Sequence, residues 1–328
     1  MREVTLLEAI RAAIWEEMER APNVFLIGED IGRLGGAFGV THGFLERFGP
    51  DRVVDAPISE TAIIGVAVGA AAMGKRPIAE MQFMDFISCG FDQVVNVAAT
   101  YRYRSGGTVS LPLVIRGPSG GYVGGSLYHS QQFEAWFFHV PGLKVVQPAF
   151  PDDAYGLMKA AIRDNNPVLF FEHKYLYRRI KGTIPQTGDD FIVPLGEARI
   201  RRAGNHLTFV TYGAMVHFAL EAAQQLETEG ISAEVIDLRT IKPLDMETIY
   251  QSVRKTSKVL VVYEAPLTGG VGAEIAARIA EHLFEWLDAP VMRVAAKDSF
   301  VPFAEPLEKF VLPSVDDILL AARQLAHY

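Results

Sequence analysis

Two stretches of this sequence hold residues that could do acid–base chemistry. In the first, Glu60 follows the strand-like run RVVDAPIS and precedes the apolar run AIIGVAVGAAAMG at residues 62–74. We expect that run to be a completely buried helix, with a single carboxylate standing at its start. The alternative is structural, because Ser59 or Glu60 could simply cap the helix, where a carboxylate interacts favourably with the helix dipole. From these residues alone, the capping interpretation is the better one.

The second stretch, GPSGGYVGGSLYHSQQFE at residues 117–134, places His129 at the end of a glycine-rich loop. Histidine titrates near neutral pH, and a histidine on a loop beside a sheet edge is a reasonable acid or base. The alternative is a histidine that only caps or packs. The isolated loop does not separate these two interpretations.

Other chemical motifs are incomplete. The run GAAAMGKR at residues 69–76 lacks the Ser or Thr that a phosphate-binding loop needs after its lysine, and it lies within a predicted helix. The turn APLTGGVGAEIA at residues 265–276 lacks the third glycine of a dinucleotide-binding turn. We interpret it as a tight strand–helix turn, although helix amides there could bind an anion. The sequence has no zinc-ligand spacing and no G-x-S-x-G elbow.

Strand and helix patterns alternate along the chain. Continuous apolar strands separated by helices predict parallel sheets covered on both faces. Thr5 and Glu8 have the spacing of a capping box. Helices are expected at residues 5–20, 61–74, 91–104, 151–164, 214–229, 245–255, 271–286 and 315–326. Strands are expected at residues 23–30, 52–58, 76–83, 111–117, 143–149, 167–174, 206–213, 232–240, 257–265 and 291–298. The pattern lapses at residues 174–196, which predicts a linker between two α/β domains.

Composition excludes several classes of protein. The 328 residues carry a net charge of −8 and no basic run, which argues against a nucleic-acid partner. The apolar run at residues 62–74 is shorter than the roughly 20 residues of a membrane span, so we expect no membrane association. The N-terminus is charged and amphipathic, unlike a signal peptide. A single cysteine, Cys89, excludes an intrachain disulfide and fits a cytoplasmic location.

Five long segments together resemble the β subunit of thiamine-diphosphate-dependent 2-oxo acid dehydrogenases. They are PISETAIIGVAVGAAAMGKRPIAEMQF, FDQVVNVAATYRYRSGG, LYHSQQFEAWFFHVPGLKVVQPAFPDDAYGLMKAAIRDNNPVLFFEHKYLYR, AEVIDLRTIKPLD and EAPLTGGVGAEI. They occur in the order found in the family, and the resemblance covers essentially the whole chain. RYRSGG, LYHSQ and EAPLTGG resemble the branched-chain type most closely, whereas the pyruvate and acetoin types share most of the rest.

The resemblance implies two doubly wound, three-layer α/β domains. Residues 1–185 would form a transketolase-like pyrimidine-binding domain, and residues 186–328 a transketolase C-terminal domain. In the family, a separate α subunit holds the cofactor's diphosphate and magnesium with a Gly-Asp-Gly motif, which this sequence lacks. The resemblance therefore implies an α2β2 heterotetramer in which each chain supplies half of an active site.

The implied reaction is oxidative decarboxylation of a branched-chain 2-oxo acid, with reductive acylation of lipoyl groups on an acyltransferase core. One alternative is the same chemistry on pyruvate or acetoin. Another is a non-catalytic α/β binding subunit whose thiamine pocket has decayed. The presence of Glu60, Phe86 and His129 argues against decay.

The resemblance also assigns roles to residues. Glu60 matches the glutamate that hydrogen-bonds N1′ of the cofactor's aminopyrimidine, and desolvation there would disfavour its charged form. Phe86 matches an aromatic ring that contacts the pyrimidine by its face. Ile58 and Gln82 match positions that line the same pocket. His129 matches a histidine that orients the 2-oxo acid carboxylate or moves a proton during acyl transfer to lipoamide.

Some members of the family bind a structural potassium ion through backbone carbonyls, and the segment AAIRDNNP fits that spacing. The matching positions are Leu111, Leu113, Val114, Ala161, Asp164 and Asn166. Cys89 lies near the pocket by implication. A reactive thiol needs an electropositive setting, and the sequence shows none, so we expect Cys89 to be buried and inert.

Overall fold

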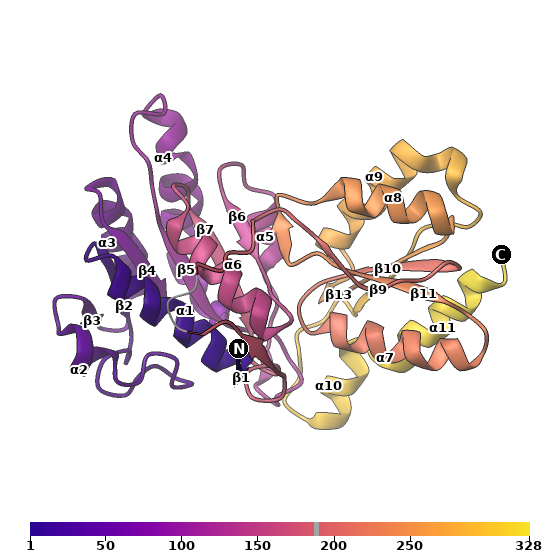
Figure 1. Cartoon of the computed structure of the whole chain (residues 1–328), viewed down its shortest axis with the longest axis horizontal. Helices are drawn as coiled ribbons and strands as arrows, with labels where there is room; N and C mark the ends of the chain where they lie inside the picture. The colour runs from indigo at the N-terminus through magenta and orange to yellow at the C-terminus, as the bar shows by residue number, and fades with distance from the viewer. Residues whose placement is uncertain (187–189) are drawn as a thin grey trace. The chain divides into compact units, whose positions relative to one another are not determined.

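The chain divides into two compact units in a computed structural model that describes residues 1–186 and 190–328 (Figure 1). The first unit comprises Met1–Ser119 and Trp136–Leu195, and the second comprises Gly120–Ala135 and Gly196–Tyr328. The glycine-rich segment therefore belongs with the C-terminal half, although sequence order places it inside the N-terminal half. The domain boundary between residues 185 and 186 stays a prediction. Residues 187–189, within the predicted linker, lie outside the described residues.

The first unit is built on a parallel sheet whose strands run in the order β6-β7-β5-β4-β2-β3. These strands are β2 (Val24–Gly28), β3 (Val53–Asp55), β4 (Arg76–Glu80), β5 (Val114–Ser119), β6 (Lys144–Val146) and β7 (Val168–His173). The helices are α1 (Leu6–Arg20), α2 (Phe44–Phe48), α3 (Glu60–Ala72), α4 (Ala99–Arg104) and α6 (Pro151–Arg163), with α5 (Glu134–Phe138) crossing from one unit to the other. Every residue of β5 and β7 is buried, as expected for strands covered on both faces.

The start of α1 confirms the predicted capping box. The Thr5 hydroxyl accepts a hydrogen bond from the Glu8 backbone N–H at 3.2 Å, and the Glu8 carboxylate accepts one from the Thr5 N–H at 2.7 Å. Two orphan donors of the helix terminus are thereby satisfied. The helix predicted at residues 91–104 is real but irregular, because a π-helical segment (Gln93–Ala98) precedes α4.

Part of the predicted linker is regular structure. Residues Lys181–Ile184 form β8, which pairs antiparallel with β1 (Arg2–Thr5) at the N-terminus of the chain. The sequence did not predict either strand, because each has only four residues and neither shows a clear alternation of apolar and polar side chains.

The second unit has a five-stranded sheet in the order β14-β13-β10-β11-β9. Its strands are β9 (Arg199–Arg202), β10 (Leu207–Thr211), β11 (Ala233–Asp237), β13 (Val259–Pro266) and β14 (Met292–Ala296), and β12 is Thr240–Lys242. Its helices are α7 (Met215–Thr228), α8 (Met246–Thr256), α9 (Val271–Leu283), α10 (Glu305–Val311) and α11 (Val315–Ala326). Figure 1 shows α8 and α9 on one face of this sheet and α7 and α11 on the other. The unpredicted strand β9 is antiparallel and lies at the edge.

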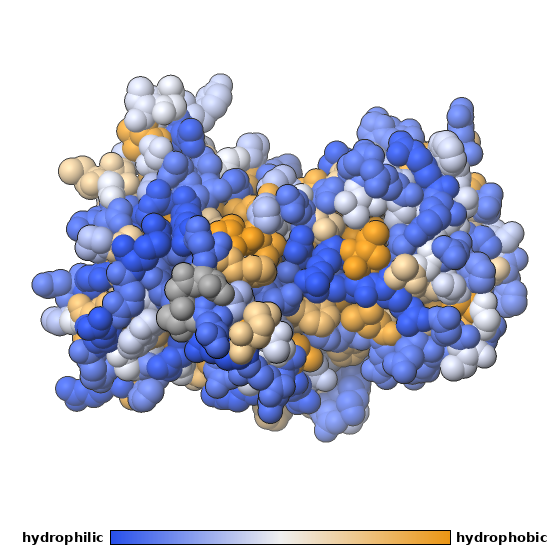
Figure 2. Space-filling view, in the orientation of Figure 1, coloured by the Kyte–Doolittle hydropathy of each residue, from blue (hydrophilic) through white to orange (hydrophobic). Residues whose placement is uncertain are grey.

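The glycines of the turn after β13 have a packing role. A Cβ on Gly270 or Gly272 would lie within 2.4 Å of the Tyr263 ring, so the helix start can approach that ring only without side chains. This supports the tight-turn interpretation over a dinucleotide-binding turn. Among the described residues, none of the helices is both long and apolar enough to cross a membrane. Figure 2 shows a mostly hydrophilic face, in line with 21% charged residues.

Candidate functional site

Three adjacent strands of the first unit end side by side and position the candidate site. Gly28 at the end of β2 is paired with Asp55 of β3 and with Glu80 of β4. The segments that leave these ends carry Glu29, then Ile58 and Glu60, then Gln82 and Phe86. Ligands of parallel α/β sheets bind beyond the carboxyl ends of the strands, which is where these residues lie.

Glu60 is the first residue of α3 and is half-buried. Ser59 is the N-cap residue, but its side chain makes no capping hydrogen bond. The interpretation of Ser59 as a cap is therefore wrong. Glu60 lies in the first helical turn, where a carboxylate is compatible with the helix dipole without being required for capping.

The prediction that the helix after Glu60 is completely buried is wrong for the single chain. Ile63, Ile64 and Ala67 are buried, but Val66 is 55% exposed and Met73, just after the helix, is 85% exposed. The segment is apolar all round, and the rest of this chain covers only one side of it. A helix that is apolar on every face is normally covered on every face.

Glu29, which lies directly after β2, is a candidate site residue that was not predicted from the sequence. Its side chain is buried, and its Oε1 atom has no hydrogen-bond partner among the described residues. Burial raises the pKa of Glu29, and the nearby charges of Glu60 and Asp30 raise it further. Two carboxyl groups from different strand ends thus share one site. The sequence feature that could have identified Glu29 is an acidic residue at the carboxyl end of a buried strand, in the run LIGED.

Gln82 and Phe86 follow β4. The Gln82 side-chain amide donates a hydrogen bond to Asp30 Oδ2 at 3.2 Å. Phe86 lies half-buried in a 3₁₀ segment, Met84–Gly90, and its ring meets Phe83 edge-on at 6.2 Å between centroids.

The 3₁₀ segment packs closely against the start of α3. A Cβ on Gly90 would lie 2.5 Å from Ile64 Cδ1 and 3.2 Å from the Glu60 carbonyl oxygen, so a larger residue there would have to displace α3 or the Ile64 side chain. Ile58, just before α3, is 84% exposed. The structure therefore places four of the five residues predicted to contact cofactor or substrate on segments that leave neighbouring strand ends.

Cys89 is exposed, and the prediction that it is buried is wrong. It lies on the outer side of the 3₁₀ segment, whose buried residues are Met84, Asp85, Ile87 and Gly90. The Thr61 hydroxyl donates a hydrogen bond to the Cys89 carbonyl. The inertness of the thiol stays a prediction.

His129, the fifth predicted site residue, belongs to the second unit. It follows a short 3₁₀ turn, Ser126–Tyr128, and is half-buried. Five residues further on, Glu134 is fully buried and accepts a hydrogen bond from the Tyr212 hydroxyl at 2.7 Å. Burial raises the pKa of Glu134 to about 7.

A buried ionic cluster lies on the strands of the sheet that carries the candidate site. The Arg116 guanidinium, on β5, donates to both Glu80 and Glu172, and the Tyr177 hydroxyl donates to Glu172 at 2.6 Å. Burial is the main cause that raises the pKa of Glu80 to about 6. A Cβ on Gly36 would lie 2.7 Å from Glu80 Oε1, so the loop that follows Glu29 rests directly on this cluster.

The six positions predicted to bind potassium lie in the first unit, and three of their carbonyls already accept hydrogen bonds. Leu113 accepts from the Val168 N–H, and Ala161 accepts from the Asp164 N–H. The Asp164 carbonyl accepts from the Arg76 guanidinium at 2.9 Å. A positive charge therefore already lies at one of the predicted ligands.

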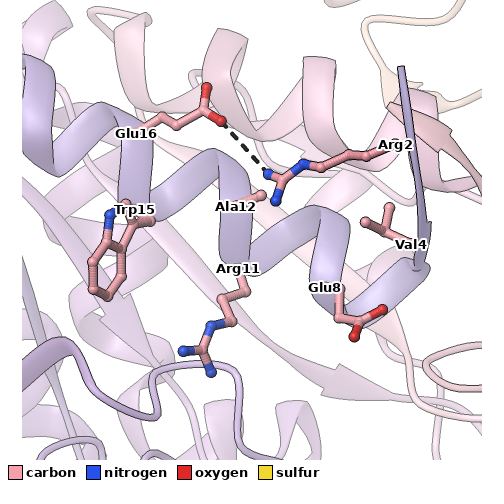
Figure 3. Close-up of a pocket in the computed structure, with 7 residues that line it drawn as sticks. All are labelled: Arg2, Val4, Glu8, Arg11, Ala12, Trp15 and Glu16. Carbon is pink, nitrogen blue, oxygen red and sulfur yellow. Dashed lines mark ion pairs between the residues drawn. The ribbon is translucent and has the colours of Figure 1, made fainter. Parts of the chain in front are cut away.

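The first unit also has a surface hollow of about 360 Å³ that holds none of the predicted site residues. Figure 3 shows Arg2 reaching from β1 toward Glu16 on α1, and their charged groups are 3.8 Å apart. The residues that line it are Arg2, Val4, Glu8, Arg11, Ala12, Trp15 and Glu16. Its charges are mixed in sign, and we assign it no function.

Comparison with known proteins matches both units to family models. The transketolase pyrimidine-binding domain matches residues 2–179, and the transketolase C-terminal domain matches residues 196–318. The chain is 50% identical to the 2-oxoisovalerate dehydrogenase subunit beta of Bacillus subtilis, over 100% of both chains.

Other relatives carry a different name. The chain is 46% identical to a pyruvate dehydrogenase E1 component subunit beta of Rickettsia felis, over 99% of each. It is 45% identical to the mitochondrial pyruvate dehydrogenase E1 component subunit beta-2 of Oryza sativa, over 99% of this chain and 87% of the relative. A solved split-gene transketolase, an inactive β4 tetramer, superposes with a TM-score of 0.79 at 24% identity, covering 99% and 98% of the two chains. That likeness concerns the fold alone.

Proposed function

Since the chain belongs to the β subunits of the 2-oxo acid dehydrogenases, we propose that it serves the branched-chain 2-oxo acid dehydrogenase reaction. The family and the transketolase-like α/β fold, both predicted from the sequence, are confirmed. Membership of this family supports the further proposal that the chain depends on thiamine diphosphate and on an α subunit. Identity of 50% to a 2-oxoisovalerate dehydrogenase subunit, against 45–46% to pyruvate dehydrogenase subunits, supports the branched-chain substrate.

The observation that carries the proposed mechanism is the pair of carboxyl groups, Glu29 and Glu60, beyond the ends of β2 and β3. A buried carboxyl oxygen without a hydrogen-bond partner fits a site that takes up a polar ligand. When bound, thiamine diphosphate supplies the nucleophilic carbon and the electron sink for decarboxylation. The residues of this chain have to bind it, orient it and hold its proton.

Each residue then has a proposed role. Glu60, which is half-buried, shares a proton with N1′ of the aminopyrimidine: the protonated carboxyl donates to the ring nitrogen, and the carboxylate accepts from it once the nitrogen is protonated. The Phe86 ring contacts the pyrimidine by its face. Ile58 and Gln82 line the same pocket, and His129 orients the substrate carboxylate or moves a proton during acyl transfer. Magnesium is held mainly by the α subunit.

The exposed apolar face of α3 is evidence that a partner chain covers it in the assembled protein. We propose that the α subunit covers it in an α2β2 assembly, which in turn acylates a lipoyl acyltransferase core. Gly65 packs against Gln93, with a Cβ position 3.3 Å from its side-chain oxygen. Gly69, one turn further along, has no atom of this chain within 4 Å of its Cβ position. The outer side of α3 is thus both apolar and sterically open.

The chain co-purified with its α subunit should oxidise 3-methyl-2-oxobutanoate and 4-methyl-2-oxopentanoate faster than pyruvate or acetoin. The assay supplies thiamine diphosphate, magnesium and an artificial electron acceptor. We expect each methylene to change the ratio of kcat/KM values by about 10–200-fold, because one methylene contributes about 1–3 kcal/mol to discrimination between substrates. Turnover confined to pyruvate or acetoin would keep the chemistry and overturn the substrate. No turnover by a cofactor-loaded assembly would favour a non-catalytic binding subunit.

Potassium binding is a further proposal that rests on the resemblance. We expect the melting temperature to be higher in KCl than in NaCl at equal ionic strength, because an ion that binds only the folded chain stabilises it. Each carbonyl has two lone pairs, so the hydrogen bond from Arg76 leaves room for an ion but opposes it by charge. Equal melting temperatures in the two salts would contradict potassium binding.

A further inference from the structure

We propose that Glu264 and Glu308 are positioning residues that hold the loop bearing His129 in its working conformation. This inference rests on the proposed role of His129 and extends it to two carboxylates that do not touch the substrate. Glu264 lies on β13 and Glu308 on α10, both within the second unit together with the loop.

The two carboxylates accept hydrogen bonds from three backbone amides of the glycine-rich loop. The Gly121 N–H donates to Glu264 Oε1 at 2.7 Å. The Val123 N–H donates to Glu308 Oε1 and the Gly124 N–H to Glu308 Oε2, both at 3.2 Å. We call these two carboxylates and three amides the loop clamp. Three backbone hydrogen bonds to two carboxyl groups restrain this glycine-rich segment along residues 121–124.

Both carboxylates of the loop clamp are buried, unlike ordinary surface carboxylates. Glu264 is 4% exposed and Glu308 is 5% exposed. On α10, Leu307 and Phe310 are exposed while Glu308 points inward, which reverses the usual distribution of polar and apolar residues. Burying a carboxylate is costly unless it is hydrogen-bonded, and the loop amides supply those bonds.

The loop backbone needs such a restraint. Tyr122 and Ser126 have φ angles of +64° and +60°, a left-handed region that non-glycine residues rarely adopt. Gly120 and Gly124 also have positive φ angles. Strained conformations of this kind persist only when the surroundings determine them. The Tyr122 hydroxyl adds a further restraint by donating to the Pro313 carbonyl at 2.8 Å.

The clamp is coupled to His129 by direct packing. A Cβ on Gly125 would lie 2.7 Å from the His129 carbonyl oxygen and 3.0 Å from the His129 Cβ. The clamped end of the loop therefore folds back onto His129. On the other side, the buried hydrogen bond between Glu134 and Tyr212 fixes the chain five residues beyond it. His129 is thus held between two anchors, and releasing one should shift its imidazole.

Glu308→Gln in the assembled holoenzyme tests the clamp, because it removes the charge and keeps the shape. Glu305→Gln is the matched control, since Glu305 is exposed on the same helix and pairs only with Lys309 among the described ion pairs. We expect faster hydrogen exchange in peptides from residues 117–134 for Glu308→Gln and unchanged exchange for Glu305→Gln. Unchanged exchange in both variants would overturn the proposal, whatever the outcome for activity, so the clamp can be judged even if the enzyme reading fails.

Activity supplies the second readout. We expect Glu308→Gln to lower kcat/KM for the 2-oxo acid by about 10–100-fold, since small displacements of catalytic groups have effects of this order. In a His129→Ala background the same substitution should cause little further loss, because residues that act through one another are not additive. A loss of the same factor in both backgrounds would show a general structural effect and contradict positioning. If Glu308→Gln fails to assemble, Tyr122→Phe is measured in the same two ways and should show the same pattern at smaller size, because it removes the hydroxyl that donates to the Pro313 carbonyl and to Met215 Sδ.

Discussion

Glu60→Gln should abolish turnover of 2-oxo acids by the assembled enzyme while leaving the fold intact. The amide keeps the size of the side chain but cannot hold a proton at the aminopyrimidine, so we expect a loss of about 10²–10⁴-fold in kcat. Glu60 is half-buried at the first turn of α3, and a neutral isostere there should change stability by no more than about 0.5 kcal/mol. Initial rates with an artificial electron acceptor, together with thermal unfolding, measure both effects.

Asp51→Asn is a suitable control for Glu60→Gln. Asp51 is an exposed carboxylate in the same unit, and its substitution removes the same charge as Glu60→Gln does. It should retain wild-type activity. If Glu60→Gln kept more than half of the wild-type rate, Glu60 would be a helix-end residue after all, and Glu29 would become the carboxyl group to examine.

Val66→Glu should prevent assembly with the α subunit and thereby remove activity. Val66 is 55% exposed on α3 in the single chain, so a glutamate there meets water and should scarcely affect the folding of this chain. In an interface, the same carboxylate would be buried without a partner, at a cost of several kcal/mol. Analytical ultracentrifugation of the co-expressed chains measures the assembly, and circular dichroism measures the fold.

Ile200→Glu offers a comparison on another exposed apolar position, since Ile200 is 48% exposed on the edge strand β9 of the second unit. Only Val66→Glu should separate the two subunits. Normal assembly of Val66→Glu would show that the α subunit covers some other surface and that the apolar face of α3 is not the contact.

The sequence predicted the elements well where their signals are local. The helix at residues 5–20 begins at its predicted capping box, and the alternation of apolar strands and helices correctly gave two α/β units. Capping and periodicity depend on neighbouring residues, so one sequence is enough to read them. Short strands such as β1 and β8 were missed because their pairing is set by partners about 180 residues apart, Arg2 with Ile184.

The site was predicted in part, for a similar reason. The segments carrying Glu60, Gln82 and Phe86 do meet at neighbouring strand ends, because parallel connections return each chain segment to the same edge. The exposure of α3 was not predictable from this chain, since an apolar run carries the same signal whether its own chain or another one covers it. Glu308 had no local signal at all, because its contact with Val123 spans 185 positions of sequence.

The buried cluster around Arg116 has a consequence for acid tolerance. One guanidinium faces two carboxyl groups, so the cluster is negatively charged when all three are ionised and becomes neutral when Glu80 takes up a proton. The pKa of Glu80 is about 6, above its ordinary value of 4.5, so the folded chain holds this proton more tightly than the unfolded chain. Its contribution to stability is complete below pH 4.5 and falls as the pH rises to about 6. Mild acidification therefore favours the folded arrangement of this cluster, against which the loop after Glu29 packs, so protonation of Glu80 should not destabilise the fold near pH 6.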